Sequence, residues 1–437
     1  MTDRTDTDTS APFDSSAPLD TGAEAQGFDL FDRDLQQDPH PHYCAMRAQA
    51  GVHYIEANGI YLVLTHDLVL EVLRDVGTFS SRNHNREPPP AEIRAEYDAM
   101  MADALPVPPT MLDNDPPSHT RYRRLVSRAF TPRMVNALRP DIEATCDRLI
   151  DQWIDTGTIE FLDAFAVPLP VAVIAKALNV PEERRHDFKR WSDDNIAAIG
   201  AKLSPEAYLA AQRGINEMQQ FFVGEFERRR IDPTDDLLTD LLHSHVGAAD
   251  DGSDDEPLSM PELVRVVQML LVAGNETTTK FLAETLRYLA AEPARWDALR
   301  ADPSLIPNAV EEGLRLAAPT QGMYRIVTTD TELGGMAIPK GSKVAIMFAS
   351  ANRDEALFDD PDAFDLQRPN PREHLAFGKG THFCVGASLS RLEGNVALER
   401  LTARLGSVAL ADTNTYEYQP SFALRGLKRL ELHVTPA

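Results

Sequence analysis

The sequence predicts a mainly α-helical domain with small β-sheets (α+β). Apolar residues recur at helical spacing through most of the chain up to about residue 318, whereas strand-like runs occur near residues 52–64 and beyond residue 323. No segment repeats along the 437 residues, of which 43% are hydrophobic and 25% charged. That composition is typical of a globular protein, and the layout predicts one domain.

The first 27 residues are rich in Thr, Asp, Ser, Ala and Pro and too poor in apolar side chains to form a core. We expect residues 1–27 to be a disordered acidic tail and residues 28–437 to be the folded domain. The tail has no apolar stretch of a secretory signal, and nowhere does the chain approach the roughly 18–20 apolar residues that cross a bilayer. The formal net charge of −25 argues against nucleic acid or an anionic membrane as a partner. We therefore expect a cytoplasmic protein.

Two β-strands are predicted near the start of the domain, over residues 52–56 and 60–64. The Asn58-Gly59 pair between them favours a tight hairpin turn. Further on, prolines cluster at 88–90 and 106–109 and bracket a segment that we expect to be a long irregular loop rather than helix. Loops of that length in compact domains are often functional.

The clearest helix follows an acidic loop at residues 250–256. Ser259 and Glu262 have the spacing of a capping box, and the apolar helical pattern after them stops before Pro293. At about 1.5 Å per residue this helix would be on the order of 45 Å long and would cross the whole domain. The remaining elements predicted are strands near 344–348 and 430–434 and a last helix near 387–405.

Cys384 is the cysteine whose surroundings suggest chemistry. Cys44 and Cys146 lie far from it and from each other, so the sequence has neither a disulfide framework nor the paired ligands of a zinc site. Glycines flank it at 378, 380 and 386, and they would let the backbone take positive φ and approach a flat ligand. The helix that starts just after Cys384 would direct free N–H groups at a thiolate. Alone, these features fit a glycine-rich turn with an incidental cysteine equally well.

The full pattern Phe377-x-x-Gly-x-His382-x-Cys384-x-Gly386 resembles the haem-binding loop of cytochromes P450. The resemblance implies that Cys384 is the axial ligand of a haem b iron, that Phe377 packs beside the sulfur, and that His382 contacts a haem propionate. Gly386 would also belong to the haem site. The same resemblance implies a triangular-prism domain around a buried haem, with O₂ as co-substrate. A thiolate ligand favours cleavage of a bound O–O bond.

Within the long helix, the run Ala273-Gly274-Asn-Glu276-Thr277 interrupts the apolar stripe. A glycine inside a helix costs roughly 1 kcal/mol relative to alanine, and a buried glutamate needs a partner. A packing glycine beside solvent-facing polar residues would explain the run without any function. The run is similar to the [AG]-G-x-[DE]-T motif of the P450 oxygen-binding helix. That similarity implies that Ala273 and Gly274 leave room for oxygen and that Glu276 and Thr277 deliver protons to it. The acid–alcohol pair also argues against the peroxide-using branch of the family.

Glu312 and Arg315 form an E-x-x-R pair, and such i, i+3 pairs are common on helix surfaces. Its position between the oxygen helix and the cysteine loop is similar to that of the P450 K helix. The resemblance implies a structural network of Glu312, Arg315 and Arg368 that holds the cysteine loop in place.

Buried haem propionates need polar or cationic partners. His119 and Arg123 are four residues apart, on one face of a predicted helix whose start resembles that of the P450 C helix. The resemblance implies that both bind propionates, together with His382 and with Arg325, which follows Gly322-Met-Tyr. Taken singly, each of these four residues could instead be an unrelated cation on the surface.

The same helix adds to a basic cluster in an acidic chain. The cluster consists of Arg121, Arg123, Arg124, Arg128 and Arg133. Charge runs are usually solvated surface. In P450s, however, this helix borders the face where the electron donor docks. The sequence has no flavin, dinucleotide or iron–sulfur motif. We therefore expect electrons from a ferredoxin, docked near Arg124, Arg128 and Lys379, and from its NAD(P)H-dependent reductase.

The function predicted is a monooxygenase that inserts one oxygen atom from O₂ into a small, largely hydrophobic substrate, most simply by hydroxylation. The pocket pieces expected by family position are residues 83–111, 196–208, Leu270 and Ala273, and 320–323, with Gln321 as a hydrogen-bond donor. They suggest a neutral terpenoid, steroid, polyketide or aromatic compound. The alternatives are a non-catalytic haem-thiolate sensor or binding protein, against which the proton-delivery pair argues, and a helical protein with chance motifs.

Overall fold

The computed structural model describes residues 27–82, 89–102, 104–199, 201–243 and 257–437. Nearly all of the expected N-terminal tail, the acidic loop at 250–256 and part of the expected pocket loop at 83–111 lie outside these residues. The described part is mainly helical with small sheets, so the predicted fold class is confirmed. No helix in it is long and apolar enough to cross a membrane.

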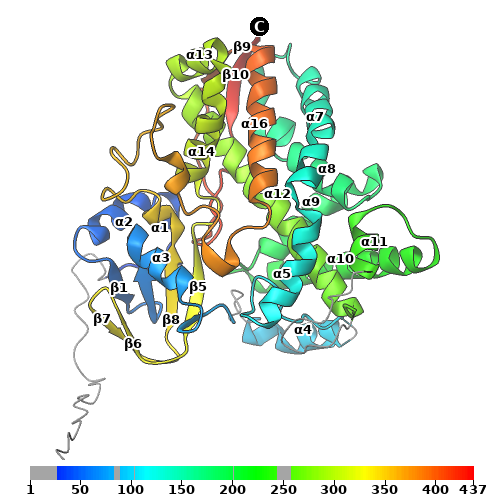
Figure 1. The fold of residues 1–437 in the computed structure, drawn as a ribbon, viewed down its shortest axis with the longest axis vertical. Coiled ribbons are helices and arrows are strands. Elements are labelled where there is room, and N and C mark those ends of the chain that lie inside the picture. The colour runs from blue at the N-terminus through cyan, green and yellow to red at the C-terminus, as the bar shows by residue number, and fades with distance from the viewer. Residues whose placement is uncertain (1–26, 83–88, 103, 200, 244–256) are drawn as a thin grey trace, which may run out of the picture.

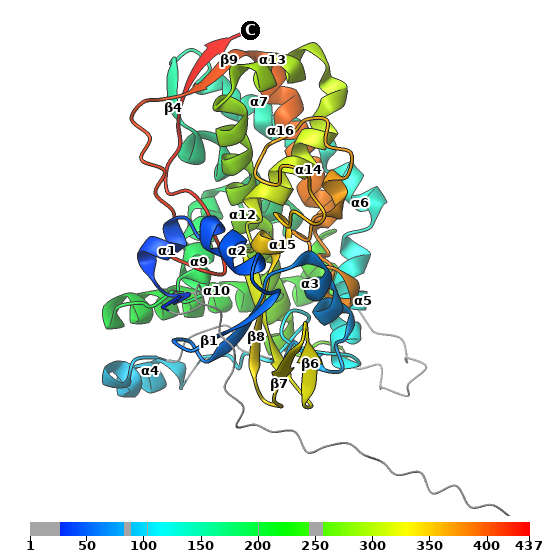
Figure 2. The same ribbon diagram turned by 90° about the vertical axis from the view of Figure 1, so that its left-hand side faces the viewer.

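Helices lie between a five-stranded sheet and a three-stranded sheet at opposite ends of the molecule (Figures 1 and 2). A two-stranded sheet is the third sheet of the described residues. The helices are α1 Arg33–Gln37, α2 His40–Arg47, α3 His66–Arg74, α4 Arg94–Met101, α5 Ser118–Ala129, α6 Pro132–Ala137, α7 Arg139–Asp151, α8 Pro168–Ala177, α9 Arg185–Ile196, α10 Pro205–Ile231, α11 Leu237–His243, α12 Met260–Ala290, α13 Pro293–Ala301, α14 Ile306–Ala317, α15 Phe348–Ala351 and α16 Ala387–Arg404. The strands are β1 Val52–Ile55, β2 Ile60–Val63, β3 Phe79–Ser80, β4 Thr158–Glu160, β5 Gly322–Val327, β6 Thr331–Leu333, β7 Met336–Ile338, β8 Lys343–Met347, β9 Leu405–Leu410 and β10 Glu431–Pro436.

The larger sheet has the strand order β1-β2-β8-β5-β3 and lies beside α1, α2 and α3 (Figure 1). The predicted hairpin is confirmed: β1 pairs antiparallel with β2, and Gly59 takes a φ of 64° in the turn. β2 then pairs parallel with β8, which brings residues far apart in sequence together. At the opposite end, β4, β10 and β9 form the second sheet (Figure 2).

The long predicted helix is α12, with 31 residues. Glu262 accepts a hydrogen bond from the backbone N–H of Ser259 at 2.8 Å, which is the capping contact that the sequence predicts. The first half of α12 packs in one hydrophobic core through Leu263, Val267 and Leu271. The second half packs in another core through residues such as Phe281. Residues 273–278 therefore lie where the two cores meet.

α12 and α16 approach closely at a glycine. A Cβ atom on Gly394 would lie 2.7 Å from the Phe281 ring, which is closer than real Cβ contacts. Phe281 is 1% exposed, so its ring has little freedom to move. Because α16 begins three residues after Cys384, this contact fixes the cysteine loop relative to α12.

One structural prediction is wrong. The proline-bracketed segment is not an irregular loop throughout, because α4 occupies Arg94–Met101 after a short 3₁₀ turn at Ala91–Ile93. Proline excludes a helix interior but is tolerated just before a helix, and Pro90 directly precedes this turn. Eight helical residues therefore fit between the two proline clusters.

Candidate active site

Cys384 lies in a tight loop between Phe377 and the start of α16. Gly378 and Gly380 have φ values of 63° and 66°, as predicted, whereas Gly386 has a φ of −82°, so the predicted positive φ is wrong for Gly386. A Cβ on Gly380 would also lie 3.0 Å from the carbonyl oxygen of Leu73. The backbone N–H of Cys384 donates to the carbonyl oxygen of Phe377 at 2.9 Å, which closes the loop.

The Cys384 thiol is surrounded by protein yet accessible. Burial raises its pKa, while the backbone N–H groups of Gly386 and Ala387 and the charges of Arg123 and Arg391 act in the opposite direction. Its side chain nevertheless has exposed surface. The N–H groups come from the start of α16, where the helix dipole also favours negative charge. The arrangement suits a thiolate bound to a metal, because coordination removes the thiol proton outright.

The Phe377 ring is held by an ion-pair network that the sequence did not reveal. The Arg391 guanidinium lies 4.6 Å from the ring centroid, and the His374 ring lies 5.7 Å away. Both side chains bind Glu311, at 2.7 Å from Arg391 Nε and 3.1 Å from His374 Nε2. Arg391 is also among the charges that favour the Cys384 thiolate. Arg391 lies seven residues after Cys384, and that spacing is the only feature of the sequence that could have suggested this role.

The four expected propionate ligands come together. The rings of His119 and His382 lie 4.5 Å apart, and the pKa of His382 is lowered to about 3 by burial, with Arg325, His119 and Arg123 among the further causes. Both ring nitrogens of His119 are buried without a partner in the described residues. Arg325 is 4% exposed, and its side chain donates to the Tyr324 carbonyl oxygen. Unpaired buried donors and cations of this kind fit a ligand that carries carboxylates.

Thr277 and its neighbours lie in the middle of α12. The Thr277 hydroxyl donates to the Ala273 carbonyl oxygen at 2.7 Å. Ala273 is exposed, so the Ala273–Thr277 face of the helix is not covered by protein. A Cβ on Gly274 would make an ordinary contact of 3.6 Å with Ile174 of α8. The space that Gly274 leaves therefore adjoins α8, and its predicted role in making room for oxygen stays a prediction.

Glu276 is a buried carboxylate held by two lysines. It is 2% exposed, and its oxygens lie 2.7 Å from Lys280 Nζ and 3.4 Å from Lys189 Nζ of α9. Burial alone would raise its pKa, but the two ammonium groups outweigh burial and lower it. Glu276 is therefore ionised at neutral pH. The i, i+4 spacing to Lys280 was visible in the sequence, whereas the contact with Lys189 was not.

Glu393 of α16 is a second buried acid, which the sequence did not reveal. It is 2% exposed, and the Thr278 hydroxyl of α12 donates to it at 3.3 Å. No cation pairs with it in the described residues, and burial raises its pKa to about 8. Glu393 is therefore mostly protonated at neutral pH. Nothing in the local sequence distinguishes it from a surface glutamate on a helix.

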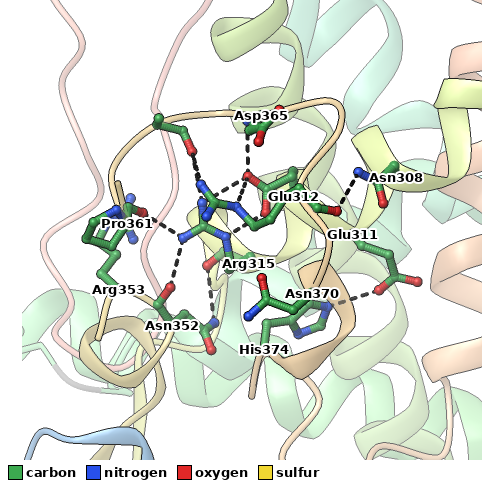
Figure 3. Close-up of polar contacts among 12 residues, drawn as sticks. Asn308, Glu311, Glu312, Arg315, Asn352, Arg353, Pro361, Asp365, Asn370 and His374 are labelled. Carbon is green, nitrogen blue, oxygen red and sulfur yellow. Dashed lines mark hydrogen bonds and ion pairs between the residues drawn. The ribbon is translucent and has the colours of Figure 1, made fainter. Parts of the chain in front are cut away.

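The predicted network of Glu312, Arg315 and Arg368 is present and buried. Figure 3 shows Glu312 and Arg315 within it. Glu312 lies 2.7 Å from Arg315 Nε and 3.0 Å from Arg368 Nε. Arg315 also donates to the carbonyl oxygen of Asn352 at 2.9 Å. The Asn352 side chain in turn accepts from the N–H of Leu375 at 2.6 Å. This series of bonds leads from the network to the residue two positions before Phe377.

The expected docking cations are exposed. Arg124, Arg128 and Lys379 lie at the surface, as does Arg133 of the basic cluster, and none of the four forms an ion pair within the described residues. Arg121 differs from them, because its guanidinium binds Glu262 at 2.7 Å and its side chain is only 26% exposed. Arg121 is therefore held by this ion pair within the fold, and the charge of Arg123 acts on His382 and Cys384.

The expected role of Gln321 as a hydrogen-bond donor is wrong. Its amide nitrogen already donates to the carbonyl oxygens of Ala317 and Ala318, at 3.2 and 2.7 Å. The amide oxygen is buried without a partner in the described residues, so Gln321 offers an acceptor instead. Of the other expected pocket pieces, Leu270 packs in a hydrophobic core and residues 83–88 and 103 lie outside the described residues.

Comparisons with known proteins identify the family of the chain. A family model described as Cytochrome P450 matches residues 203–405. A steroid C26-monooxygenase of Mycobacterium tuberculosis is 37% identical over 417 residues, which cover 95% of this chain and 98% of that protein. The 6-deoxyerythronolide B hydroxylase of Saccharopolyspora erythraea is 40% identical over 324 residues, 74% of this chain and 77% of that protein.

Solved structures are similar over nearly the whole chain. Cytochrome P450 CYP109Q5 from Chondromyces apiculatus has a TM-score of 0.79 and 36% identity, with 94% of this chain and 98% of that chain covered. CYP109E1 from Bacillus megaterium, solved in complex with testosterone, has a TM-score of 0.78 and 31% identity, with 92% and 99% covered.

Proposed function

Because the chain belongs to the cytochrome P450 family and is a monooxygenase that uses haem b and O₂, we propose that Cys384 is the ligand of its haem iron. The observation that carries this proposal is the position of the thiol, which receives two backbone N–H groups at the start of α16 and lies in the field of Arg123 and Arg391. When bound, haem supplies the redox chemistry that transfers one oxygen atom to the substrate and reduces the other to water. The full-length relatives are named as monooxygenases and a hydroxylase, so a non-catalytic sensor is not supported.

His119, Arg123, Arg325 and His382 would hold the haem propionates. Arg123 and Arg325 supply positive charge, and the neutral imidazoles of His119 and His382 supply N–H donors. Phe377 and Gly386 would line the side of the haem that faces the sulfur. Ala273 and Gly274 of α12 would line the opposite side.

Glu276 and Thr277 would move protons toward the oxygen site. Lys189 is the solvent-side member of this group, with a side chain that is 28% exposed. The ionised Glu276 can accept a proton at its carboxylate from the Lys189 side and release it inward. The Thr277 hydroxyl now donates to the Ala273 carbonyl oxygen, so it must rotate to donate elsewhere.

Electrons would come from a separate ferredoxin and its NAD(P)H-dependent reductase. Arg124, Arg128, Arg133 and Lys379 give a basic surface beside the cysteine loop in a chain of net charge −25. An acidic iron–sulfur protein would be attracted to this surface, with an association rate that falls as salt rises. Reversing the charge of Arg124 and Arg128 should slow electron transfer and weaken its salt dependence.

The substrate would be a neutral, largely hydrophobic molecule of steroid or polyketide type that becomes hydroxylated. This class is supported by the apolar pocket pieces Leu270 and Met323 and by the names of two relatives, which refer to a steroid and to 6-deoxyerythronolide B. The free amide oxygen of Gln321 could accept a hydrogen bond from a substrate hydroxyl. Titration of the ferric protein with such compounds, followed by the low-to-high-spin absorbance change, would identify the class.

Replacement of the sulfur tests the proposal. We expect Cys384→Ala to lose the red-shifted absorption band of the reduced, CO-treated protein and to abolish product formation with a donor system. Cys146→Ala is the matched control, because Cys146 is buried in the helical core and should leave the band unchanged. A Cys384→Ala protein that keeps the band and the activity would exclude Cys384 as the ligand.

A further inference from the structure

Asp115, just before α5, binds the end of β3 with both carboxylate oxygens. One oxygen accepts from the Ser80 hydroxyl at 2.5 Å, and the other accepts from the Ser81 backbone N–H at 2.8 Å. Ser80 and Ser81 are 6% and 3% exposed. The carboxylate therefore fixes two buried serines that belong to a different part of the chain.

Ser81 connects this carboxylate to the cysteine loop. Its hydroxyl lies 2.9 Å from Nε2 of His382, two residues before Cys384. Asp115 also reaches His119 through the backbone, because its carbonyl oxygen accepts from the His119 N–H at 2.9 Å. The Asp115–Ser81 contact thus joins the two histidines expected to bind propionates, which lie on separate segments.

Asp115 is also a negative charge among these cations. Burial lowers the pKa of Arg325, and among the described residues the charge of Asp115 acts in the opposite direction. The guanidinium of Arg82, with a side chain that is 61% exposed, lies 3.8 Å from the same carboxylate, too far for a hydrogen bond. The field of Asp115 is therefore only partly neutralised within the described residues.

We propose that Asp115 and Ser81 are positioning residues for the haem. Asp115 holds Ser81 by its backbone, and Ser81 donates its hydroxyl proton to Nε2 of His382. That bond leaves the proton of the neutral imidazole on Nδ1, where it can donate to a propionate. The charge of Asp115, close to the propionate ligands, in addition disfavours the uptake of an electron by the haem. The inference rests on the proposed propionate role of His382.

The rate at which haem leaves the protein tests the hydrogen-bond part. We expect Ser81→Ala to speed haem transfer to excess apomyoglobin by about ten-fold, since His382 then loses the contact that orients its Nδ1–H toward the charged propionate. Ser81→Thr keeps the hydroxyl and should restore the slow rate. Ser80→Ala is the matched control, because Ser80 binds the same carboxylate but makes no recorded bond to His382. Equal rates for Ser81→Ala and Ser80→Ala would overturn the proposal.

A double-mutant cycle separates this inference from the role on which it rests. We expect His382→Ala to speed haem loss, and we expect Ser81→Ala to add nothing further in the His382→Ala background. An unchanged rate in His382→Ala would refute its propionate role. A fast His382→Ala with a slow Ser81→Ala, or with additive effects of the two, would refute only the positioning role of Ser81.

The reduction potential of the haem iron tests the charge part. Asp115→Asn keeps one acceptor oxygen but removes the charge, so the potential should become more positive, because a nearby anion disfavours the added electron. Asp115→Glu keeps the charge and should stay near the native potential. Ser81→Ala should change the potential less than Asp115→Asn does. Equal potentials in native protein and Asp115→Asn would overturn the electrostatic role of Asp115.

Discussion

Two buried glutamates, Glu276 within α12 and Glu393 on α16, have surroundings that give them opposite protonation states. Glu276 lies between two lysines and has a lowered pKa, whereas Glu393 accepts a hydrogen bond from Thr278, has no cation partner in the described residues and has a pKa raised to about 8. Both are 2% exposed, so burial does not distinguish them. The two glutamates are distinguished by whether a cation lies beside the carboxylate in the described residues. Within one helix packing layer, the protein therefore holds one carboxylate as a base and another as an acid.

The largest expected effect comes from removing the stronger cation of Glu276. Lys280→Met keeps the aliphatic stem but leaves a buried carboxylate with one distant lysine, which should lower the free energy of unfolding by about 3–5 kcal/mol. Urea unfolding of the holoprotein measures the loss. The double variant Lys280→Met/Glu276→Gln removes the uncompensated charge and should recover most of it. A single variant as stable as the native protein would show that the ion pair does not stabilise the ionised acid.

The next effect is on turnover. Glu276→Gln cannot carry a proton at its carboxylate, so we expect product formation to fall by roughly 100-fold at equal haem content. Glu393→Gln is the matched control, since it changes the other acid of the pair, and its effect should be smaller. Should Glu393→Gln lose more activity than Glu276→Gln, the roles of the two acids would have to be exchanged.

The pH dependence of stability should differ between the two sites. Glu393 has a folded pKa above its usual value of 4.5, so its favourable contribution is complete below pH 4.5 and is lost as pH rises toward 8. Relative to the native protein, Glu393→Gln should therefore gain stability over this window, by on the order of 2–4 kcal/mol. Glu276 has a lowered pKa, so its contribution is present above its usual value and is lost as pH falls. If urea unfolding of the native protein and of Glu393→Gln changed equally between pH 5 and pH 8, the raised pKa of Glu393 would be contradicted.

The smallest effect is expected from the partly exposed lysine. Lys189→Met removes an ammonium group 3.4 Å from Glu276, but solvent screens this charge more than that of Lys280. We expect a loss of about 1 kcal/mol or less in urea unfolding, well below that of Lys280→Met. A loss as large as that of Lys280→Met would mean that the two lysines share the carboxylate equally.

The sequence was sufficient to predict the features that are formed by residues close together in the chain. The loop around Cys384, the capping pair that starts α12 and the Glu312–Arg315 pair could each be recognised from residues close together in the chain. Asp115–Ser81–His382, Lys189–Glu276 and Thr278–Glu393 could not, because each contact joins segments whose approach only the folded chain decides. The failure at Gln321 has the same origin. Its amide nitrogen is used by backbone carbonyl groups that become available only because α14 ends there.

The contact between Gly394 and Phe281 has a consequence for how far the chain can vary. One missing methyl group sets the separation between α16, which follows Cys384, and α12. A larger side chain at position 394 would push α12 and α16 apart and would widen the space between them. The fit of the haem would then change, although none of the residues that line its site had been substituted.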